Sequence, residues 1–346
     1  MTQDECAAPE AKSSLISFRR VVVFVILGTL VYALIGLYAR VDDIAAALAT
    51  VPLWVLAVMI GLSFLNYLIR YAKWQFYLNR IGVQLGHSVS FRVFLAGFTL
   101  TVTPAKIGEA VKGYFIYEID GTPVAKTAPV VVSERVTDLL AMVLLAILGF
   151  SIGISTSDAL FTVIMLGGLV LVGAIVLGRK ELYNKVLKRL TSVGPLKRFG
   201  ESCDLIEDTM TKTLCPRAMI ISTMISMPGW FMECLELWIL LSIMSGAGLP
   251  TLSWVSFMLL VDATFIHSAS SVIGAVTFLP GGLGTYEATS VLLMMGLLSF
   301  TNAAASAATI LIRFVTLWFS VVVGFVALRL LNRAKQSSAQ LTAHQP

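Results

Sequence analysis

Long uninterrupted apolar runs dominate this chain, and many of them reach about 20 residues or more. A helix of that length crosses the hydrocarbon core of a bilayer, whereas a soluble domain breaks its apolar segments with solvated charges every few turns. Of the 346 residues, 57% are hydrophobic and only 13% are charged. The sequence therefore predicts a multi-spanning membrane protein and argues against a soluble domain.

Six apolar runs are continuous enough to be spans, and two more are interrupted by Pro and Gly. The predicted spans are residues 20–39, 52–78, 126–156, 159–178, 216–245 and 303–328, and the interrupted regions are 89–118 and 251–298. No small-residue cleavage site follows the first span, so we expect that span to be retained.

Basic residues cluster at one set of chain ends and loops. They occur before the first span (Lys12, Arg19, Arg20), at the end of the second (Arg70, Lys73, Arg80), in the loop 179–217, which begins as an amphipathic helix pattern, and near the C-terminus (Arg329, Arg333, Lys335), whereas 246–250 carries no Lys or Arg. The positive-inside rule then places both termini, with the tails 1–15 and 335–346, in the cytoplasm and a single transmembrane domain over 16–334, in the cell (inner) membrane. The net charge of +5 fits this orientation, and no basic segment interleaves aromatics as a nucleic-acid partner would require.

The orientation of the spans determines how the interrupted regions must run. If the loops on both sides of 89–118 are cytoplasmic, this region must enter and leave the membrane on that side. By the same reasoning, 251–298 must enter and leave from the outside. We therefore expect an all-α, polytopic membrane helix bundle with two re-entrant helical hairpins, each built from two half-helices.

The two interrupted regions share a pattern of residues. In each, a Pro is followed four residues later by a Gly, then by a Glu within a turn, and by an Arg roughly thirty residues downstream. These residues are Pro104, Gly108, Glu109 and Arg135 in the first region, and Pro280, Gly284, Glu287 and Arg313 in the second. The order of span, hairpin and span therefore occurs twice, in opposite orientations. This predicts an inverted-topology repeat over about 52–156 and 216–328, the plan of many secondary transporters.

The Pro/Gly breaks predict an internal polar pocket. Irregular backbone at membrane depth survives only where protein or a water-filled cavity satisfies it, and the N-terminus of the following half-helix favours an anion. Lys106 and Lys112 flank the first break and would strengthen a phosphate site. An alternative remains open: Glu109 and Glu287 are themselves the anions that complete these helices.

Charged residues inside the spans mark the same pocket. Glu134, Arg135 and Asp138 lie near the middle of one span, Arg135 being about 13 Å deep, and Arg313 lies about equally deep from the other side. Such charges are costly unless they are paired or hydrated, and Asp138 is spaced to pair with Arg135. By contrast, we interpret Arg70, Lys73 and Arg80 as interfacial residues that extend toward the headgroups, and His267 as a structural hydrogen-bonding residue.

Three stretches, "TPAKIGEAVKGYF", "SERVTDLLAMVLL" and "LPGGLGTYEA", resemble the lysylphosphatidylglycerol synthase transmembrane region, also called the flippase-like family. The resemblance covers roughly residues 15–330. In the best-known members, this region moves aminoacylated phosphatidylglycerol between leaflets. The matching residues are Gly108, Glu109, Glu134, Arg135, Asp138, Pro280, Gly281, Gly282, Gly284 and Glu287. Lys112 stands where the family commonly has Arg, and no aminoacyl-transferase domain follows, so the resemblance implies a lipid transporter and not a synthase.

We therefore expect a lipid translocase with no cofactor and no metal. Its expected partners are membrane lipids, either an anionic or aminoacylated phospholipid or an isoprenoid or hopanoid lipid, together with a separately encoded lipid-modifying enzyme. The predicted substrate-binding residues are Lys106, Gly108, Glu109, Lys112, Glu134, Arg135, Asp138, Pro280, Gly281, Gly282, Gly284, Glu287 and Arg313. The alternatives are an intramembrane enzyme that uses Glu233, Glu236, Asp262 and His267, although the chain has no HExxH, GxSxG or Walker motif, and a non-transporting scaffold.

Overall fold

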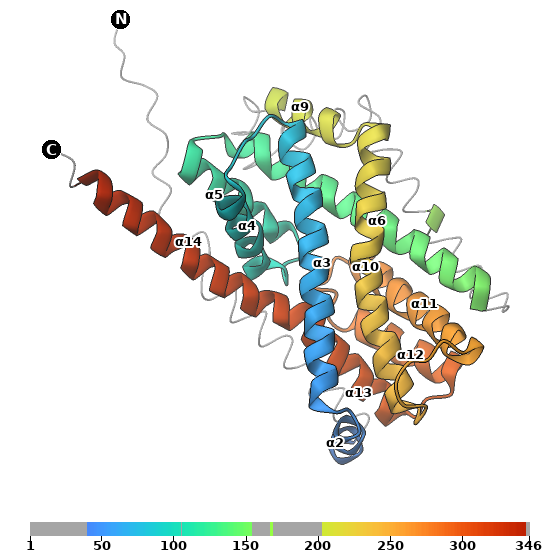
Figure 1. Ribbon diagram of the computed structural model, residues 1–346. Helices are drawn as coiled ribbons and strands as arrows, with labels where there is room; N and C mark the ends of the chain where they lie inside the picture. Colours follow the sequence, from blue (N-terminus) through green and yellow to red (C-terminus); the bar gives the residue numbers. More distant parts are fainter. Residues whose placement is uncertain (1–39, 105, 154–166, 169–202, 344–346) are drawn as a thin grey trace, which may run out of the picture.

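The computed structural model describes residues 40–104, 106–153, 167–168 and 203–343 (Figure 1). The first predicted span, nearly all of the predicted span 159–178 and the start of the amphipathic loop lie outside these residues, so the structure does not test them. Within the described part, the regular structure is helical apart from one isolated bridge.

Five helical segments in the described part are long and apolar enough to cross a membrane. They are α3 (Leu53–Arg80), α6 (Val124–Gly153), α10 (Pro216–Met244), α11 (Trp254–Val276), and the continuous run of α13 (Asn302–Arg313), the π-helical turn η4 (Phe314–Trp318) and α14 (Phe319–Ala343). The predicted spans 52–78, 126–156, 216–245 and 303–328 coincide with α3, α6, α10 and the last run, and these are confirmed as helices of membrane-spanning length.

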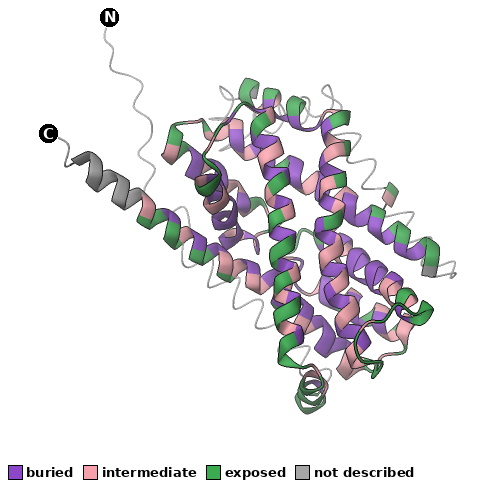
Figure 2. Cartoon of the chain, viewed as in Figure 1, coloured by how far each residue is buried: buried purple, intermediate pink, exposed green. Residues whose placement is uncertain are grey.

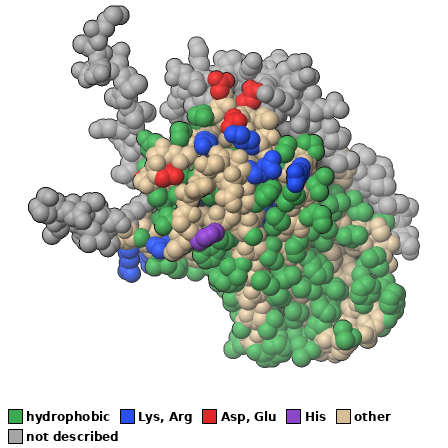
Figure 3. Space-filling model, turned by 45° about the horizontal axis from the view of Figure 1, so that its top comes forward, with side chains coloured by type: hydrophobic (Ala, Val, Ile, Leu, Met, Phe, Trp, Pro, Cys, Tyr) green, Lys and Arg blue, Asp and Glu red, His purple; other side chains and the backbone are tan. Residues whose placement is uncertain are grey.

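The surface of the bundle is apolar over a broad area. Large hydrophobic side chains are exposed on its outer faces, for example Leu65 and Leu68 on α3 and Ile220 and Met224 on α10. Figure 3 shows hydrophobic side chains covering the lower part of one face, with charged side chains gathered above them. Figure 2 shows that buried residues line the contacts between the helices. A continuous apolar exterior is what a bilayer requires, so this is a multi-pass membrane protein.

The first interrupted region folds into two short helical arms. Its elements are α4 (His87–Ala96), the 3-10 turns η1 (Gly97–Leu100) and η2 (Ile107–Ala110), and α5 (Val111–Asp120). Each α-helix has 10 residues and is about 15 Å long, half of a hydrocarbon core of about 30 Å. Neither arm can cross a bilayer alone.

The second interrupted region has arms of unequal length. After the break, α12 (Thr285–Leu298) has 14 residues, as expected of a half-helix. By contrast, α11 has 23 residues and is long enough by itself to cross a membrane. The sequence predicts a half-helix at this position. Between the start of α11 at Trp254 and Phe278 there is no Pro and no residue with a positive φ, so neither kind of break stops α11 earlier.

The two breaks meet inside the bundle. Pro104 and Pro280 form an isolated antiparallel bridge, although 176 residues separate them in the chain. In Figure 1, α4 and α5 lie toward the end of the bundle where α3 ends and α10 begins, near α9 (Cys203–Thr213). The helix α12 lies toward the other end, near α2 (Val41–Ala49). The non-helical segments therefore face each other across the protein interior.

Gly324 seats α14 against the first break. A Cβ at this position would lie 2.4 Å from the Thr99 main-chain nitrogen, and main chain cannot move aside as a flexible side chain can. We expect Gly324→Ala to lower the free energy of unfolding by about 1–3 kcal/mol, measured by thermal unfolding in detergent. Gly61→Ala on the exposed face of α3 is the control: nothing lies within 4 Å, and Ala favours a helix. Equal melting temperatures for the two variants would contradict the prediction.

Candidate substrate cavity

A cavity of about 610 Å³ lies where the two breaks meet. Thr103 and Lys106 line it from the first break, and Gly281 and Gly282 line it from the second. The helices around it contribute Arg70, Arg135, Asp138, Glu233, His267 and Arg313, among apolar residues such as Val131 and Met142, and Leu279 adds apolar surface from the second break. The cavity therefore combines a largely apolar wall with a few converging polar groups, which is typical of ligand sites.

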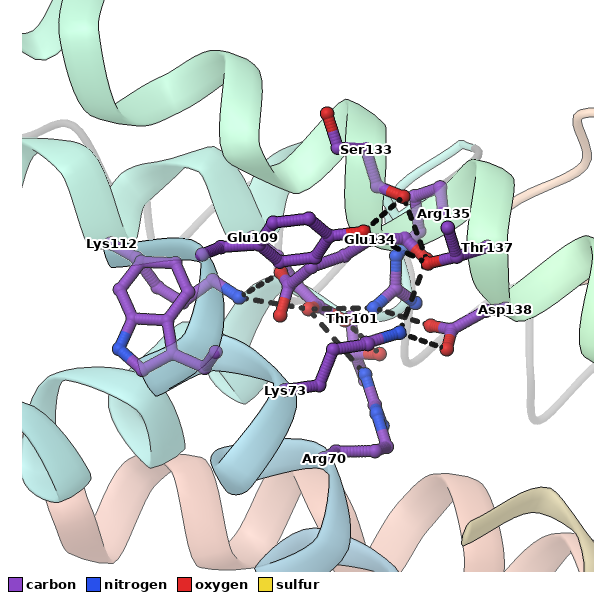
Figure 4. Close-up of polar contacts among 12 residues, drawn as sticks. Arg70, Lys73, Thr101, Glu109, Lys112, Ser133, Glu134, Arg135, Thr137 and Asp138 are labelled. Carbon is purple, nitrogen blue, oxygen red and sulfur yellow. Dashed lines mark hydrogen bonds and ion pairs between the residues drawn. The ribbon is translucent and has the colours of Figure 1, made fainter. Parts of the chain in front are cut away.

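Three cations surround one buried carboxylate behind the cavity wall (Figure 4). Glu109 is fully buried, and its Oε2 lies 3.5 Å from Arg135 Nη2, 3.7 Å from Lys112 Nζ and 3.8 Å from Arg70 Nη2. The hydroxyl of Thr101 donates to its other oxygen at 3.1 Å. Glu109 thus holds the cations of α3, α5 and α6 together.

A second carboxylate completes the network. Asp138 accepts a hydrogen bond from Lys73 Nζ, which also donates to Ser226 Oγ at 2.8 Å, and its Oδ2 lies 3.1 Å from Arg135 Nη2. The pairing of Asp138 with Arg135 that their spacing predicts is confirmed. The interfacial interpretation of Arg70 and Lys73 is wrong, because these side chains are 5% and 0% exposed and face carboxylates instead of the headgroups.

Several charged atoms of this network have no hydrogen-bond partner among the described residues. They are Arg70 Nη2, Arg135 Nε, Arg135 Nη2, Glu109 Oε2 and Asp138 Oδ2, and all are buried. Burying a charged donor or acceptor without a hydrogen bond costs free energy comparable to a lost hydrogen bond or more. Arg70, Arg135 and Asp138 also line the cavity. A ligand that accepts hydrogen bonds would satisfy the guanidinium groups there.

Lys106 stands at the tip of the first break. Its main chain is left-handed, with a φ of 55°, which is unusual for a residue with a side chain. Its Nζ lies 5.3 Å from the ring centroid of Trp230, and no ion pair within 4 Å is recorded for it in the described part of the chain. With Arg70, Lys73, Lys112 and Arg135, it brings the cations of this region to five, against the four carboxylates of Glu109, Glu134, Asp138 and Glu233. The excess of positive charge favours an anion.

The second break carries its own anion. Glu287 Oε2 accepts from the main-chain nitrogen of Gly284 at 2.7 Å, which completes the first turn of α12. Its other oxygen accepts from Arg313 Nε at 2.8 Å, and Arg313 Nη2 donates to the Gly281 carbonyl at 2.6 Å. The alternative that the carboxylate caps its own helix therefore holds for Glu287. At the first break, Thr103 Oγ1 instead accepts from Gly108 N at 2.7 Å.

Comparison with known proteins identifies the family. The chain matches the family described as the lysylphosphatidylglycerol synthase TM region over residues 25–324. It belongs to that family. It is also 22% identical over 330 residues to a UPF0104 membrane protein of Methanocaldococcus jannaschii, an alignment that covers 90% of this chain and 95% of that protein. Family membership makes this a membrane protein related to lipid metabolism, and it confirms the resemblance read from the three motifs.

The predicted substrate-binding residues divide into three groups. Those that line the cavity are Lys106, Arg135, Asp138, Gly281, Gly282 and Arg313. Behind the lining, Glu109 and Glu287 hold cations, and Lys112 Nζ lies 2.6 Å from Glu134 Oε2 and 4.5 Å from the Trp74 ring centroid. Gly108, Pro280 and Gly284 belong to the turns. Arg70, Thr103 and Trp230 also line the cavity and were not predicted, although counting ten residues back from the end of α3 would have placed Arg70 deep.

The residues of the enzyme alternative do not gather into a metal site. Glu233 Oε2 lies 3.2 Å from His267 Nε2, and Tyr286 Oη lies 3.0 Å from His267 Nδ1. In the part of the chain that the structure describes, no three His, Cys, Asp or Glu side chains could hold a metal ion together. The interpretation of His267 as a hydrogen-bonding residue agrees with these contacts.

The contact between the breaks can be tested by cross-linking. Paired residues of an antiparallel bridge have Cα atoms about 4.5–5.5 Å apart, within the range of a disulfide. We expect Pro104→Cys/Pro280→Cys to form a disulfide on mild oxidation, in a background whose native cysteines are replaced by Ser. Mass spectrometry of the digested protein would detect it. The pair Pro104→Cys/Leu252→Cys, with Leu252 exposed before the start of α11, is the control and should stay unlinked. The same result from both pairs would contradict the bridge.

Proposed function

We propose that this protein is a lipid translocase that moves a polar, phosphate-bearing headgroup between leaflets through the cavity while the lipid tails stay in the bilayer. One observation carries the proposal. Buried guanidinium atoms of Arg70 and Arg135 make no hydrogen bond within the described part of the chain, and both side chains border a cavity of about 610 Å³ inside a protein whose exterior is apolar. Such an arrangement suits an anionic group that arrives from the membrane.

In this proposal, the arginines and Lys106 bind the phosphate. Arginine matches phosphate oxygens with two parallel hydrogen bonds, and lysine adds a point charge. Glu109 and Asp138 keep the guanidinium groups in place when the cavity is empty, because each lies within 4 Å of Arg135. The apolar part of the lining accommodates the glycerol or isoprenoid region next to the headgroup.

We further propose that the two interrupted regions are re-entrant hairpins of an inverted-topology repeat, with both termini in the cytoplasm. The short arms α4, α5 and α12, the opposite ends of the bundle toward which they lie, and the bridge between Pro104 and Pro280 support this arrangement. Two such units offer two ways of opening one cavity, first to one leaflet and then to the other.

The test is lipid movement by the purified protein. The protein is reconstituted in liposomes that carry a fluorescent phospholipid, and an impermeant reductant added outside bleaches only the outer leaflet. Translocation predicts that nearly all of the fluorescence becomes bleachable, compared with about half in protein-free liposomes. Bleaching that stops at the protein-free level, for anionic, zwitterionic and isoprenoid phosphate probes alike, would reject the proposal.

A further inference from the structure

A second polar cluster, separate from the arginine network, lies beside the cavity. We name it the Glu236 cluster and define it as Ser63, Asn66, Glu233, Glu236, His267 and Tyr286. It joins α3, α10, α11 and α12. Glu233, His267 and Tyr286 line the cavity, whereas Glu236 is fully buried behind them.

The hydrogen bonds of Ser63 determine which atom carries a proton. Its Oγ lies 2.9 Å from Glu236 Oε1 and 2.9 Å from the Val315 carbonyl oxygen. A hydroxyl has one proton to donate, and a carbonyl oxygen can only accept. If each contact is a hydrogen bond with its own proton, Ser63 donates to Val315 and accepts from a protonated Glu236.

The surroundings of Glu236 also favour the neutral acid. No ion pair is recorded for its carboxyl group in the described part of the chain, and its Oε2 has no hydrogen-bond partner. Glu233 lies three positions earlier, on the same face of α10. Ionising both would place two negative charges side by side in a buried region, which is costly.

Other titratable or charged groups face this part of α10 from the elements that pack around it. They are Tyr67, Arg70 and Lys73 on α3, Lys106 at the first break, whose Nζ lies 5.3 Å from the Trp230 ring centroid, His267 on α11, Tyr286 on α12, Arg313 on α13, Cys234 on α10 itself, and Asp138 on α6, which with Lys73 contacts α10 ten residues earlier at Ser226. Arg70 and Arg313 have carboxylates of their own nearby, Glu109 and Glu287. His267 is the partner recorded within 4 Å of Glu233.

We propose that Glu236 and Glu233 form a proton-binding site in which Glu236 holds a proton at neutral pH and Glu233, with His267, connects it to the cavity. On release, the proton leaves the Glu236 carboxyl oxygen, passes to the Glu233 carboxylate and then to His267 or to cavity water, and Glu236 remains as a carboxylate. Asn66 Nδ2 donates to Glu233 Oε1 at 2.5 Å and orients this carboxylate.

The consequence for transport rests on the proposed function. A carboxylate newly formed behind the cavity wall is attracted to the cations that would hold the phosphate, so the bound headgroup and the ionised Glu236 compete for the same positive charge. The rate of translocation would then respond to a proton gradient.

Whether Glu236 carries a proton is tested without lipid. Infrared spectra of the purified full-length protein at pH 7 are recorded in the carbonyl region of protonated carboxylic acids. We expect Glu236→Gln to remove one such band and Ser63→Ala to shift it, because its hydrogen-bond acceptor is gone. Asp262→Asn removes a half-buried carboxyl group on α11 outside the cavity and serves as the control that leaves this band in place. A wild-type minus Glu236→Gln difference spectrum without a protonated-acid band would overturn the proposal.

Transport is then measured in the liposome assay with and without a pH difference. We expect the difference to change the wild-type rate severalfold and to have no effect on the rate of Glu236→Gln, whose neutral amide still donates to Ser63. A rate of lipid movement that is the same with and without the pH difference would overturn the proposed proton exchange. It would not contradict the proposed translocase. If the infrared band is present but no lipid moves at any pH, the proposed translocase is rejected and the proposed proton site is retained.

Discussion

Arg135→Ala is expected to slow lipid translocation in liposomes by about tenfold to a hundredfold. A hydrogen bond to a charged group contributes about 1.5–3 kcal/mol, and each 1.4 kcal/mol corresponds to a factor of ten in rate or affinity. Arg135 brings to the cavity guanidinium atoms that make no hydrogen bond with the described residues, and it lies within 4 Å of both Glu109 and Asp138. Its loss removes the phosphate contact and leaves two carboxylates that repel an anion.

Two further variants make this result specific. Arg135→Lys keeps the charge and loses the planar fork, so its rate should lie between those of the wild type and Arg135→Ala. Lys212→Ala is the matched control: its ion pair with Asp208 lies on the surface, the two side chains being 44% and 48% exposed, and the rate should not change. Folding of each variant is checked by gel filtration and melting temperature. Equal translocation by well-folded Arg135→Ala and wild type would show that lipid does not pass through this cavity.

Lys112→Met is expected to lower the free energy of unfolding by about 3–5 kcal/mol, the largest stability effect predicted for a single side chain here. Lys112 and Glu134 are 0% and 1% exposed, and their charged atoms lie 2.6 Å apart behind the cavity wall. Removing the ammonium group leaves a buried carboxylate without its partner. Thermal unfolding in detergent should show a melting temperature lower by on the order of 10 °C.

The double variant Lys112→Met/Glu134→Gln tests whether Lys112 and Glu134 interact. Because a neutral amide is less costly to bury than an unpaired charge, we expect it to recover most of the stability lost in Lys112→Met. Additive losses in the two single variants and the double variant would indicate that the two residues do not interact. The contrast with Arg135 matters for function: Lys112 is not part of the cavity lining, so the folded double variant should retain translocation.

The local helix signals in the sequence predicted most of the framework. The spans at α3, α6 and α10 were placed within a few residues of their ends, because long apolar runs and the residues that end them are local signals. The breaks at Pro104 and Pro280 were placed correctly for the same reason, since Pro and the positive-φ glycines Gly281 and Gly282 cannot continue a helix. The length of α11 was not predicted. The charges of the flanking loops indicate on which side of the membrane this region begins and ends, and they carry no information on the length of each helix within it.

The burial of Arg70 and Lys73 could not be settled from local pattern. On an isolated α3, both side chains could extend toward the headgroups, so interfacial placement was a reasonable hypothesis. In the folded protein their partners come from distant segments, Glu109 for Arg70 and Asp138 for Lys73, 65 residues further along the chain. Only the packing of η2 and α6 against α3 decides that these cations face inward.

By itself, the sequence determined that this is a helical membrane protein, where its chain breaks inside the apolar region, and which family it belongs to. These properties depend on hydropathy, backbone geometry and motifs that neighbouring residues carry. Only the tertiary structure decided that the two breaks touch, that Glu287 caps its own helix while Glu109 gathers cations, and that Glu236 lies 2.9 Å from Ser63. Charge pairing in a low-dielectric interior depends on distances of a few ångströms between segments far apart in the chain, and local sequence does not encode those distances.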